Sequence, residues 1–214
     1  MSKLRIGVLV SGRGSNLQAI INAMEMGCLT ADIAIVISDQ PGVYALERAA
    51  KHGIPTAVIE RKGYSSREHF EAMLRDMLTE YNVDIVALAG FMRILSSSFI
   101  TNYPQRIVNI HPALLPAFTG LHAQAQALAY GVKLSGCTVH FVDDGMDTGP
   151  IILQEAVPVL DNDTEETLAA RIVEAEHRIY PAALQLLVTG RIIIEGRRVK
   201  ILAESLEGGK KNYD

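Results

Sequence analysis

The sequence predicts an α/β protein built on a doubly wound, mostly parallel sheet, with an antiparallel part toward the C-terminal end. Four short apolar runs, at 4–10, 33–37, 56–59 and 84–89, alternate with segments whose apolar residues recur at helical spacing. A glycine-containing turn follows the first run directly. Two later runs, 134–142 and 151–159, are joined by a short loop, which favours an antiparallel pair.

The first half of the chain repeats a strand followed by a helix. A buried strand at 4–10 precedes a turn in which Ser15 or Asn16 is expected to cap a helix that ends at Gly27. Further helices are expected over residues 45–50 and 66–78, the second capped by Ser65 or Ser66. A β-α-β-α-β-α-β rhythm implies parallel strands joined by right-handed crossovers.

The second half departs from this rhythm. A short helix is expected around 97–101, a fifth strand over 107–110, an Ala-rich helix over 121–130 and the two strands already described. Thr164 and its acidic neighbours are expected to cap the longest helix, in which Pro181 should kink or divide the chain. Residues 191–194 and 198–201 predict a hairpin, and 206–214 a flexible tail.

Composition narrows the class of protein. The chain has 214 residues, 49% of them hydrophobic and 21% charged, which suits one globular domain. A net charge of −4 argues against a general nucleic-acid or membrane-surface binder. Cys28 and Cys137 show neither disulfide-scaffold nor zinc spacing, so we expect no metal and a cytoplasmic location. No apolar run approaches the ~20 residues that span a bilayer.

The turn after the first strand, residues 12–17, is suited to an anion. Its glycines let the backbone approach a ligand, and the first N–H groups of the following helix would face outward with the positive end of the dipole. It matches neither the dinucleotide fingerprint, because Leu17 stands where the third glycine belongs, nor a P-loop. A plain tight turn remains the alternative to a phosphate monoester site.

Asn109 and His111 end the fifth strand, two residues apart, so both point to the same side. Ligands bind outside the carboxyl ends of parallel strands. An amide can donate to an oxygen that becomes negative, and an imidazole can move a proton, a pairing that suits acyl transfer. No serine or cysteine nucleophile stands in a suitable motif, which favours direct attack by the substrate. The alternative is a loop histidine that merely caps the strand.

The acidic loop 143–150 could supply a carboxylate to His111. Asp147 is the candidate, whereas the side chains of Asp143 and Asp144 are expected to be solvated or to form turns. The loop lacks an oxygen-ligand spacing for a cation. His140 is expected to serve packing or a local hydrogen bond.

Taken together, these segments resemble the folate-dependent formyltransferases, which have a Rossmann-like fold. The matching stretches cover nearly the whole chain in order, and they are 11–20, 89–95, 109–116, 136–142, 147–152 and 176–181. The His-Pro-x-Leu-Leu-Pro stretch is typical of the wider group. The Gly-x-Gly-Ser-Asn-Leu loop is similar to that of the members that formylate glycinamide ribonucleotide.

The resemblance implies transfer of a formyl group from 10-formyltetrahydrofolate to the amino group of glycinamide ribonucleotide, in purine synthesis, by direct amine attack. It implies a catalytic triad of Asn109, His111 and Asp147. It also implies a cis bond between Leu115 and Pro116. The ribonucleotide-binding residues would be Gly14, Ser15, Asn16 and Glu176, and the folate-binding residues Arg93, Ile94, Leu95, Val142, Asp143, Asp144, Gly145 and Met146.

The resemblance also divides the expected single domain, 1–214, into a nucleotide-phosphate-binding half, 1–105, and a catalytic and folate half, 106–205. Some relatives carry a lysine that helps to hold the phosphate where this chain has Val173. The expected partners are the two small-molecule substrates, with no nucleic acid and no membrane, and a homodimer is the assembly to test for. A formyltetrahydrofolate deformylase, a methionyl-tRNA formyltransferase and a non-catalytic nucleotide-binding module are the alternatives.

Overall fold

A computed structural model describes residues 3–203 and places seven strands in one sheet. Their order is β3-β2-β1-β4-β5-β6-β7, in which β1 to β5 run parallel and β6 pairs antiparallel with both β5 and β7. The strands are β1 (Arg5–Val10), β2 (Asp32–Ser38), β3 (Thr56–Val58), β4 (Ile85–Leu88), β5 (Ile107–His111), β6 (Leu134–Phe141) and β7 (Ile151–Pro158). This confirms the expected doubly wound sheet with an antiparallel C-terminal part.

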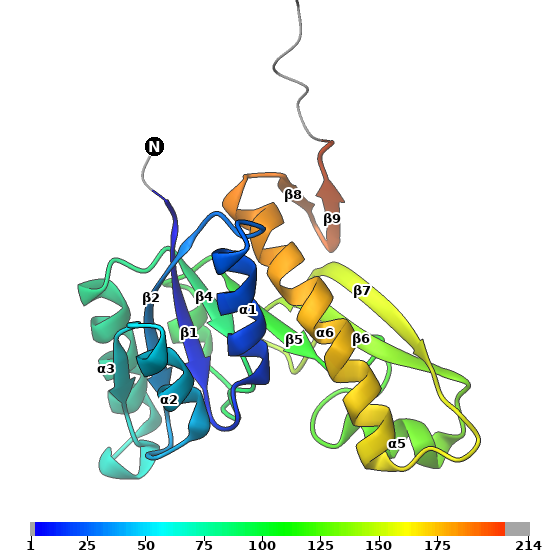
Figure 1. Cartoon of the computed structure of the whole chain (residues 1–214). Helices are drawn as coiled ribbons and strands as arrows, with labels where there is room; N and C mark the ends of the chain where they lie inside the picture. The colour runs from blue at the N-terminus through cyan, green and yellow to red at the C-terminus, as the bar shows by residue number, and fades with distance from the viewer. Residues whose placement is uncertain (1–2, 204–214) are drawn as a thin grey trace, which may run out of the picture.

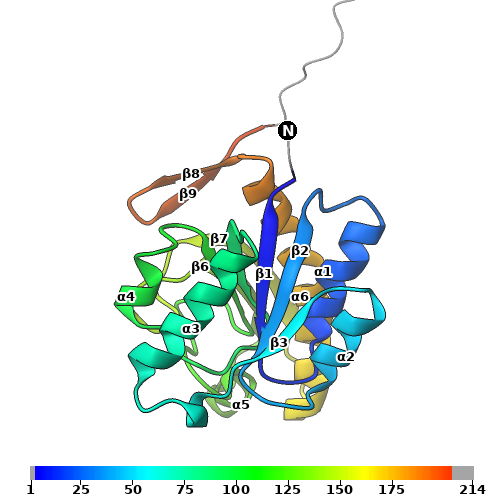
Figure 2. The ribbon, with the colours of Figure 1, turned by 90° about the vertical axis from the view of Figure 1, so that its left-hand side faces the viewer.

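Helices cover both faces of the sheet, as Figures 1 and 2 show from two sides. They are α1 (Ser15–Glu25), α2 (Tyr44–Lys51), the 3-10 turn η1 (Arg61–Gly63), α3 (Arg67–Glu80), α4 (Ser97–Ile100), α5 (Ala123–Tyr130) and α6 (Glu165–Val188). Helices α1, α2, α5 and α6 contribute to one hydrophobic cluster, and α3 and α4 to the other. Strand β1 supplies both, because Val8 and Val10 face the first cluster and Leu9 faces the second.

The start of α1 differs from the prediction. Ser15 and Asn16 lie inside the helix, and the N-cap is Gly14, in the left-handed conformation at φ 70°, with no side chain capping the first turn. Only glycine fits here, because a Cβ on Gly14 would lie 2.6 Å from the Cβ of Ala45. The predicted caps of two other helices are confirmed, since Ser66 and Thr164 accept hydrogen bonds from N–H groups of their helices.

Pro181 does not divide the longest helix, which runs unbroken from Glu165 to Val188 (Figure 1). A proline inside a helix costs about 3 kcal/mol. Its neighbours are strongly buried: Tyr180 and Leu184 are fully inaccessible, and the tyrosine hydroxyl donates to the carbonyls of Leu88 and Val108 at 2.9 and 3.1 Å. Packing of α6 against α1, β6 and β7, together with the tyrosine bonds to β4 and β5, therefore outweighs the local preference.

The predicted hairpin is confirmed as β8 (Ile192–Glu195) and β9 (Arg198–Ile201), a separate two-stranded sheet. Three of its side chains pack against the cluster under α6, and they are Ile192, Ile194 and Val199. The predicted tail at 206–214 lies outside the described residues. Within 3–203, no helix is long and apolar enough to cross a membrane.

Candidate active site

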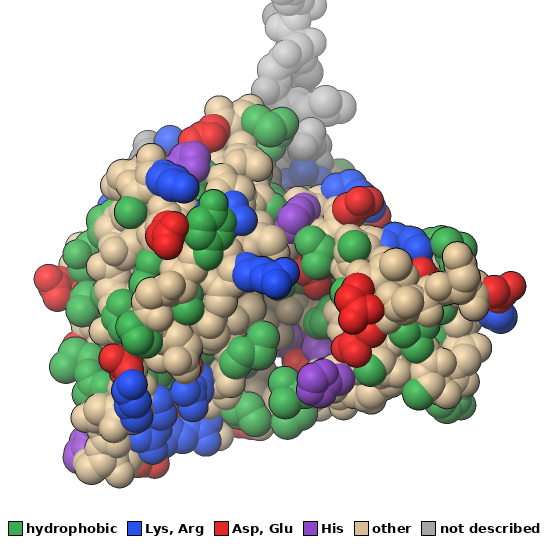
Figure 3. All heavy atoms as spheres, turned by 60° about the horizontal axis from the view of Figure 1, so that its bottom comes forward, with side chains coloured by type: hydrophobic (Ala, Val, Ile, Leu, Met, Phe, Trp, Pro, Cys, Tyr) green, Lys and Arg blue, Asp and Glu red, His purple; other side chains and the backbone are tan. Residues whose placement is uncertain are grey.

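Successive side chains of β5 point to opposite faces of the sheet, so core residues and candidate site residues alternate along the strand. Val108 and Ile110 belong to the cluster that α6 covers, so Asn109 and His111 project from the opposite face. His111 is buried, and Asn109 is partly exposed. In Figure 3 the surface is hollowed near the middle of the view, where histidine and acidic side chains are visible.

His111 is held at both ring nitrogens. Its Nε2 donates to the carbonyl of Phe118 at 2.8 Å, and its Nδ1 lies 3.4 Å from Oδ2 of Asp147. The same carboxylate oxygen accepts the N–H of Gly120 at 2.8 Å. With Nε2 committed as a donor, a proton on Nδ1 would make an imidazolium that donates on both sides. Of the three loop aspartates, the structure therefore brings Asp147 to His111, as the resemblance implied.

His140 also belongs to this cluster; the local hydrogen bond expected for it is present, but its contact with Asn109 was not predicted. It lies opposite Asn109 in the β5–β6 register, and its Nε2 is 3.3 Å from Nδ2 of Asn109 and 3.8 Å from Oδ1 of Asp147. Its Nδ1 donates to the carbonyl of Phe141 at 2.8 Å. Burial lowers the pKa of His140. A neutral ring with its proton on Nδ1 accepts from the Asn109 amide and fixes the orientation of that amide.

The chain beyond His111 is clamped from β6 and β7. The Leu115–Pro116 peptide is cis, as predicted. The hydroxyl of Thr138 donates to the carbonyl of Ala113 at 2.7 Å and accepts from the N–H of Leu115 and the amide of Gln154. These hydrogen bonds fix the chain between His111 and Phe118, whose carbonyl accepts the hydrogen bond from His111.

The loop 143–150 is held together by hydrogen bonds to the side chain of Asp143. Oδ1 of Asp143 accepts the hydroxyl of Thr148 at 2.6 Å and the N–H of Gly145 at 3.2 Å. Asp143 thus forms a turn within the loop and Asp144 is exposed, both as expected. Met146 is 52% exposed, which leaves an apolar side chain beside the carboxylate of Asp147.

The first turn of α1 meets α6 through buried polar groups. Nδ2 of Asn16 donates to Oε2 of Glu176 at 2.8 Å, and the two residues are both buried. Burial raises the pKa of Glu176 to about 7, an effect that the hydrogen bond from Asn16 opposes. The predicted ribonucleotide residues Asn16 and Glu176 are therefore in contact, and the uncapped first turn of α1 lies beside them.

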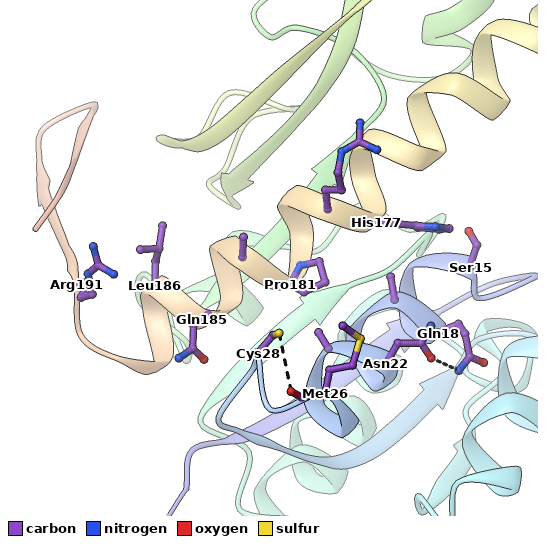
Figure 4. Close-up of a pocket in the computed structure, with 14 residues that line it drawn as sticks. Ser15, Gln18, Asn22, Met26, Cys28, His177, Pro181, Gln185, Leu186 and Arg191 are labelled. Carbon is purple, nitrogen blue, oxygen red and sulfur yellow. Dashed lines mark hydrogen bonds between the residues drawn. The ribbon is translucent and has the colours of Figure 1, made fainter. Parts of the chain in front are cut away.

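A groove of about 580 Å³ runs between α1 and α6 from this point (Figure 4). His177 of α6 points toward Ser15 at one end of the groove, and its buried Nε2 has no hydrogen-bond partner. Burial lowers the pKa of His177, with a smaller contribution from the nearby Arg48. The groove continues to Cys28 and lies apart from the triad.

A basic cavity lies at the predicted folate residues. Nε of Arg93 donates to the buried Asp39 at 2.6 Å, and a cavity of about 360 Å³ is lined by Arg93, Ile94, Arg67 and Arg61. Lys and Arg side chains gather at the lower left of Figure 3, on the side of the molecule that carries η1 and α3. Sequence reasoning missed Arg61 and Arg67, which start separate elements, and only the fold brings them to Arg93.

This fold and this arrangement of an amide, an imidazole and a carboxylate define a protein of the formyl transferase family, to which the chain belongs, since the family matches residues 4–184. Phosphoribosylglycinamide formyltransferase of Escherichia coli is 43% identical over 88% of this chain and 89% of its own length. The solved structure of glycinamide ribonucleotide transformylase 1 from Symbiobacterium toebii is 54% identical, covers 94% of this chain and 95% of its own, and superposes with a TM-score of 0.93.

A formyltetrahydrofolate deformylase from Pseudomonas syringae has the same fold at lower identity, 27%, with a TM-score of 0.88 over 94% of this chain and 67% of its own. The curated relatives that match at 48% to 53% identity are trifunctional purine biosynthetic proteins, among them that of Drosophila melanogaster, and the chain spans only 14% to 19% of their length.

Proposed function

We propose that this protein transfers the formyl group of 10-formyltetrahydrofolate to the amino group of glycinamide ribonucleotide, in purine synthesis. The observation that carries the proposal is the convergence of Asn109, His111 and Asp147 at the end of β5, with the Asn16–Glu176 pair at the end of α1. Family membership supports the reaction type, and the names of the relatives that match over their full length support this acceptor.

In the proposed mechanism the neutral amine attacks the formyl carbon and a new C–N bond forms. The carbonyl oxygen becomes negative and accepts a hydrogen bond from the amide of Asn109, worth roughly 3–4 kcal/mol of the barrier. The positive charge of a protonated His111, whose two N–H groups are engaged by Phe118 and Asp147, stabilises the oxyanion electrostatically. Asp147 holds the charged ring through Nδ1. The attacking nitrogen then loses a proton, the bond from the formyl carbon to N10 of the folate breaks, and N10 takes a proton, relayed through water with the help of Asp147.

The ribonucleotide would lie at the junction of α1 and α6. The uncapped N–H groups after Gly14, with Ser15 and Asn16, would bind the phosphate. Glu176 would accept the ribose hydroxyls. Where relatives have a lysine this chain has Val173, and the unpartnered Nε2 of His177, which points toward Ser15, is placed to take over part of that role (Figure 4).

The folate would lie on the other side of His111. The predicted folate-binding residues are Arg93, Ile94, Leu95, Val142, Asp143, Asp144, Gly145 and Met146. The glutamate carboxylates of a folate would meet three guanidinium groups in this cavity. Arg67 and Arg93 are already paired with the buried acids Glu71 and Asp39, whereas Arg61 donates to the carbonyl of Tyr64.

The alternative is hydrolysis of the formyl-folate, as in the deformylase with the same fold. The test measures release of tetrahydrofolate by the purified protein with and without glycinamide ribonucleotide, together with formation of the formylated ribonucleotide. Transfer requires both substrates, and release at an equal rate without the ribonucleotide would establish the hydrolase instead. The division into two halves, the cytoplasmic location and the homodimer stay predictions.

A further inference from the structure

The turn of the C-terminal hairpin touches the loop that carries Asp147. Nη2 of Arg197 donates to the carbonyl of Thr148 at 2.7 Å. Thr148 directly follows Asp147, whose backbone is in the left-handed region at φ 55°, a conformation that needs support in a residue with a side chain. The hairpin therefore reaches the peptide next to the carboxylate that pairs with His111.

The hairpin is an anchored support for this contact. Ile192, Ile194 and Val199 pack against the main hydrophobic cluster, and the N–H of Leu202 donates to the carbonyl of Arg191 at 2.9 Å, which closes the base of the hairpin. Strand β9 also lies against β7. The backbone that presents Arg197 is thus fixed to the same core as the catalytic sheet.

Thr148 is held at both of its oxygen atoms. Its hydroxyl donates to Asp143 inside the loop, and its carbonyl accepts from Arg197 outside it. The next residue, Gly149, lies so close to β6 that a Cβ would meet the carbonyl of Phe141. The Thr148–Gly149 peptide is therefore confined between β6 and the hairpin, and this confinement limits where the preceding Asp147 can place its carboxylate.

Charge favours the same contact. The loop contains Asp143, Asp144 and Asp147, and the guanidinium of Arg197 brings a positive charge against it. A hydrogen bond from a charged donor is stronger than one between neutral groups.

We propose that Arg197 is a positioning residue for formyl transfer: it holds the loop 143–150 so that Asp147 faces His111 and the folate-binding backbone of the loop is formed before the substrate arrives. This inference rests on the proposed function for the role of Asp147. The family match ends at residue 184, so the arginine belongs to a part of the chain to which that match assigns no role.

The test compares R197A with K200A. Each removes one positive charge from the hairpin, but Lys200 pairs with Glu195 inside the hairpin and not with the loop. For both variants and the wild type, hydrogen exchange of residues 142–150 is measured in the free protein, and kcat and the KM of each substrate are measured in the transfer assay.

For R197A we expect exchange in 142–150 to accelerate, the KM for the formyl-folate to rise about fivefold and kcat to fall, while the KM for the ribonucleotide stays unchanged. K200A should match the wild type in every measurement. Unchanged exchange or unchanged kinetics in R197A would overturn the inference, as would equal changes in K200A. The exchange measurement needs no activity, so it separates failure of this contact from failure of the proposed reaction.

Discussion

Asn109 and His140 face each other across the antiparallel pair of β5 and β6, and their side chains meet with Nδ2 3.3 Å from Nε2. Because His140 donates through Nδ1 to a backbone carbonyl, its Nε2 can only accept. The histidine therefore fixes one amide hydrogen of Asn109. The other amide hydrogen remains available for a developing oxyanion.

Replacing His140 tests this relationship. In His140→Phe an aromatic ring is kept, at a somewhat larger volume, but the acceptor is lost, so the amide of Asn109 can rotate. We expect kcat to fall about tenfold or more, equivalent to about 1.4 kcal/mol, with little change in either KM. Steady-state kinetics measure this split. A variant whose KM values rise while kcat is preserved would point to a role in substrate binding instead.

The pairing of His111 with Asp147 makes a second prediction. Asp147→Asn keeps the shape and the acceptor for the N–H of Gly120 but removes the negative charge that faces Nδ1. We expect kcat to fall about 10²- to 10³-fold, as for other groups that stabilise transition-state charge. Circular dichroism and thermal unfolding check that the fold is intact. Asp76→Asn, on the exposed side of α3, is the matched control, and wild-type turnover in Asp147→Asn would contradict the mechanism.

The raised pKa of Glu176 leads us to expect that ribonucleotide binding depends on pH. Its pKa is raised to about 7 by burial. The ionised carboxylate accepts hydroxyl hydrogens better than the neutral acid, so the KM for the ribonucleotide should rise as the pH falls from about 8 to about 6. In Glu176→Gln this dependence should disappear. An equal pH profile in both proteins would assign the titration to another group.

The same pKa shift has a consequence for stability. The folded-state pKa of Glu176 lies above the ordinary value of 4.5, so the stabilising contribution of the protonated carboxyl is complete below about pH 4.5 and is lost as the pH rises through about 7. Urea unfolding of the wild type should therefore show a decline in stability over this interval that Glu176→Gln lacks. The comparison is made at matched ionic strength.

We expect the buried hydroxyl of Tyr180 to stabilise the fold where α6 meets β4 and β5. Its buried hydroxyl bonds the carbonyls of Leu88 and Val108, on β4 and β5. Tyr180→Phe should reduce the free energy of unfolding by about 1–2 kcal/mol, measured by urea denaturation. Tyr130→Phe is the control, because Tyr130 is 80% exposed and should change stability by less than about 0.5 kcal/mol. Equal losses would contradict a specific role for the buried hydroxyl.

Local sequence patterns predicted the strands and helices well, but they predicted one helix cap and the effect of one proline poorly. Periodicity and turn residues located the strands, and Ser66 and Thr164 as caps, because these depend on neighbours within a few residues. The cap of α1 was predicted wrongly: Gly14 takes that place because Ala45 leaves no room for a side chain. Pro181 was expected to kink or divide the longest helix, and it does not divide it, because packing of α6 against the sheet decides the outcome.

Site residues that share one sequence motif were predicted well, and contacts between residues of different motifs were not. Asn109 and His111 share a strand, so alternation alone gives them a common side. The resemblance assigned Asn16 and Glu176 to the same substrate, but the hydrogen bond between them was not predicted, because the two residues are far apart in the sequence. His140 was expected to serve packing or a local hydrogen bond, and its bond to Phe141 agrees with this. Its contact with Asn109 was not predicted, because it depends on the β5–β6 register, which no local pattern specifies.

The hairpin contact has a practical consequence for how the domain is delimited. A protein fragment cut at residue 184, where the family match ends, would contain Asn109, His111, Asp147 and Glu176 and would count as complete by its motifs. It would lack Arg197, which binds the loop beside Asp147. With the role proposed for Arg197, the functional boundary of this domain lies beyond β9, and we expect a truncation before that strand to lose activity.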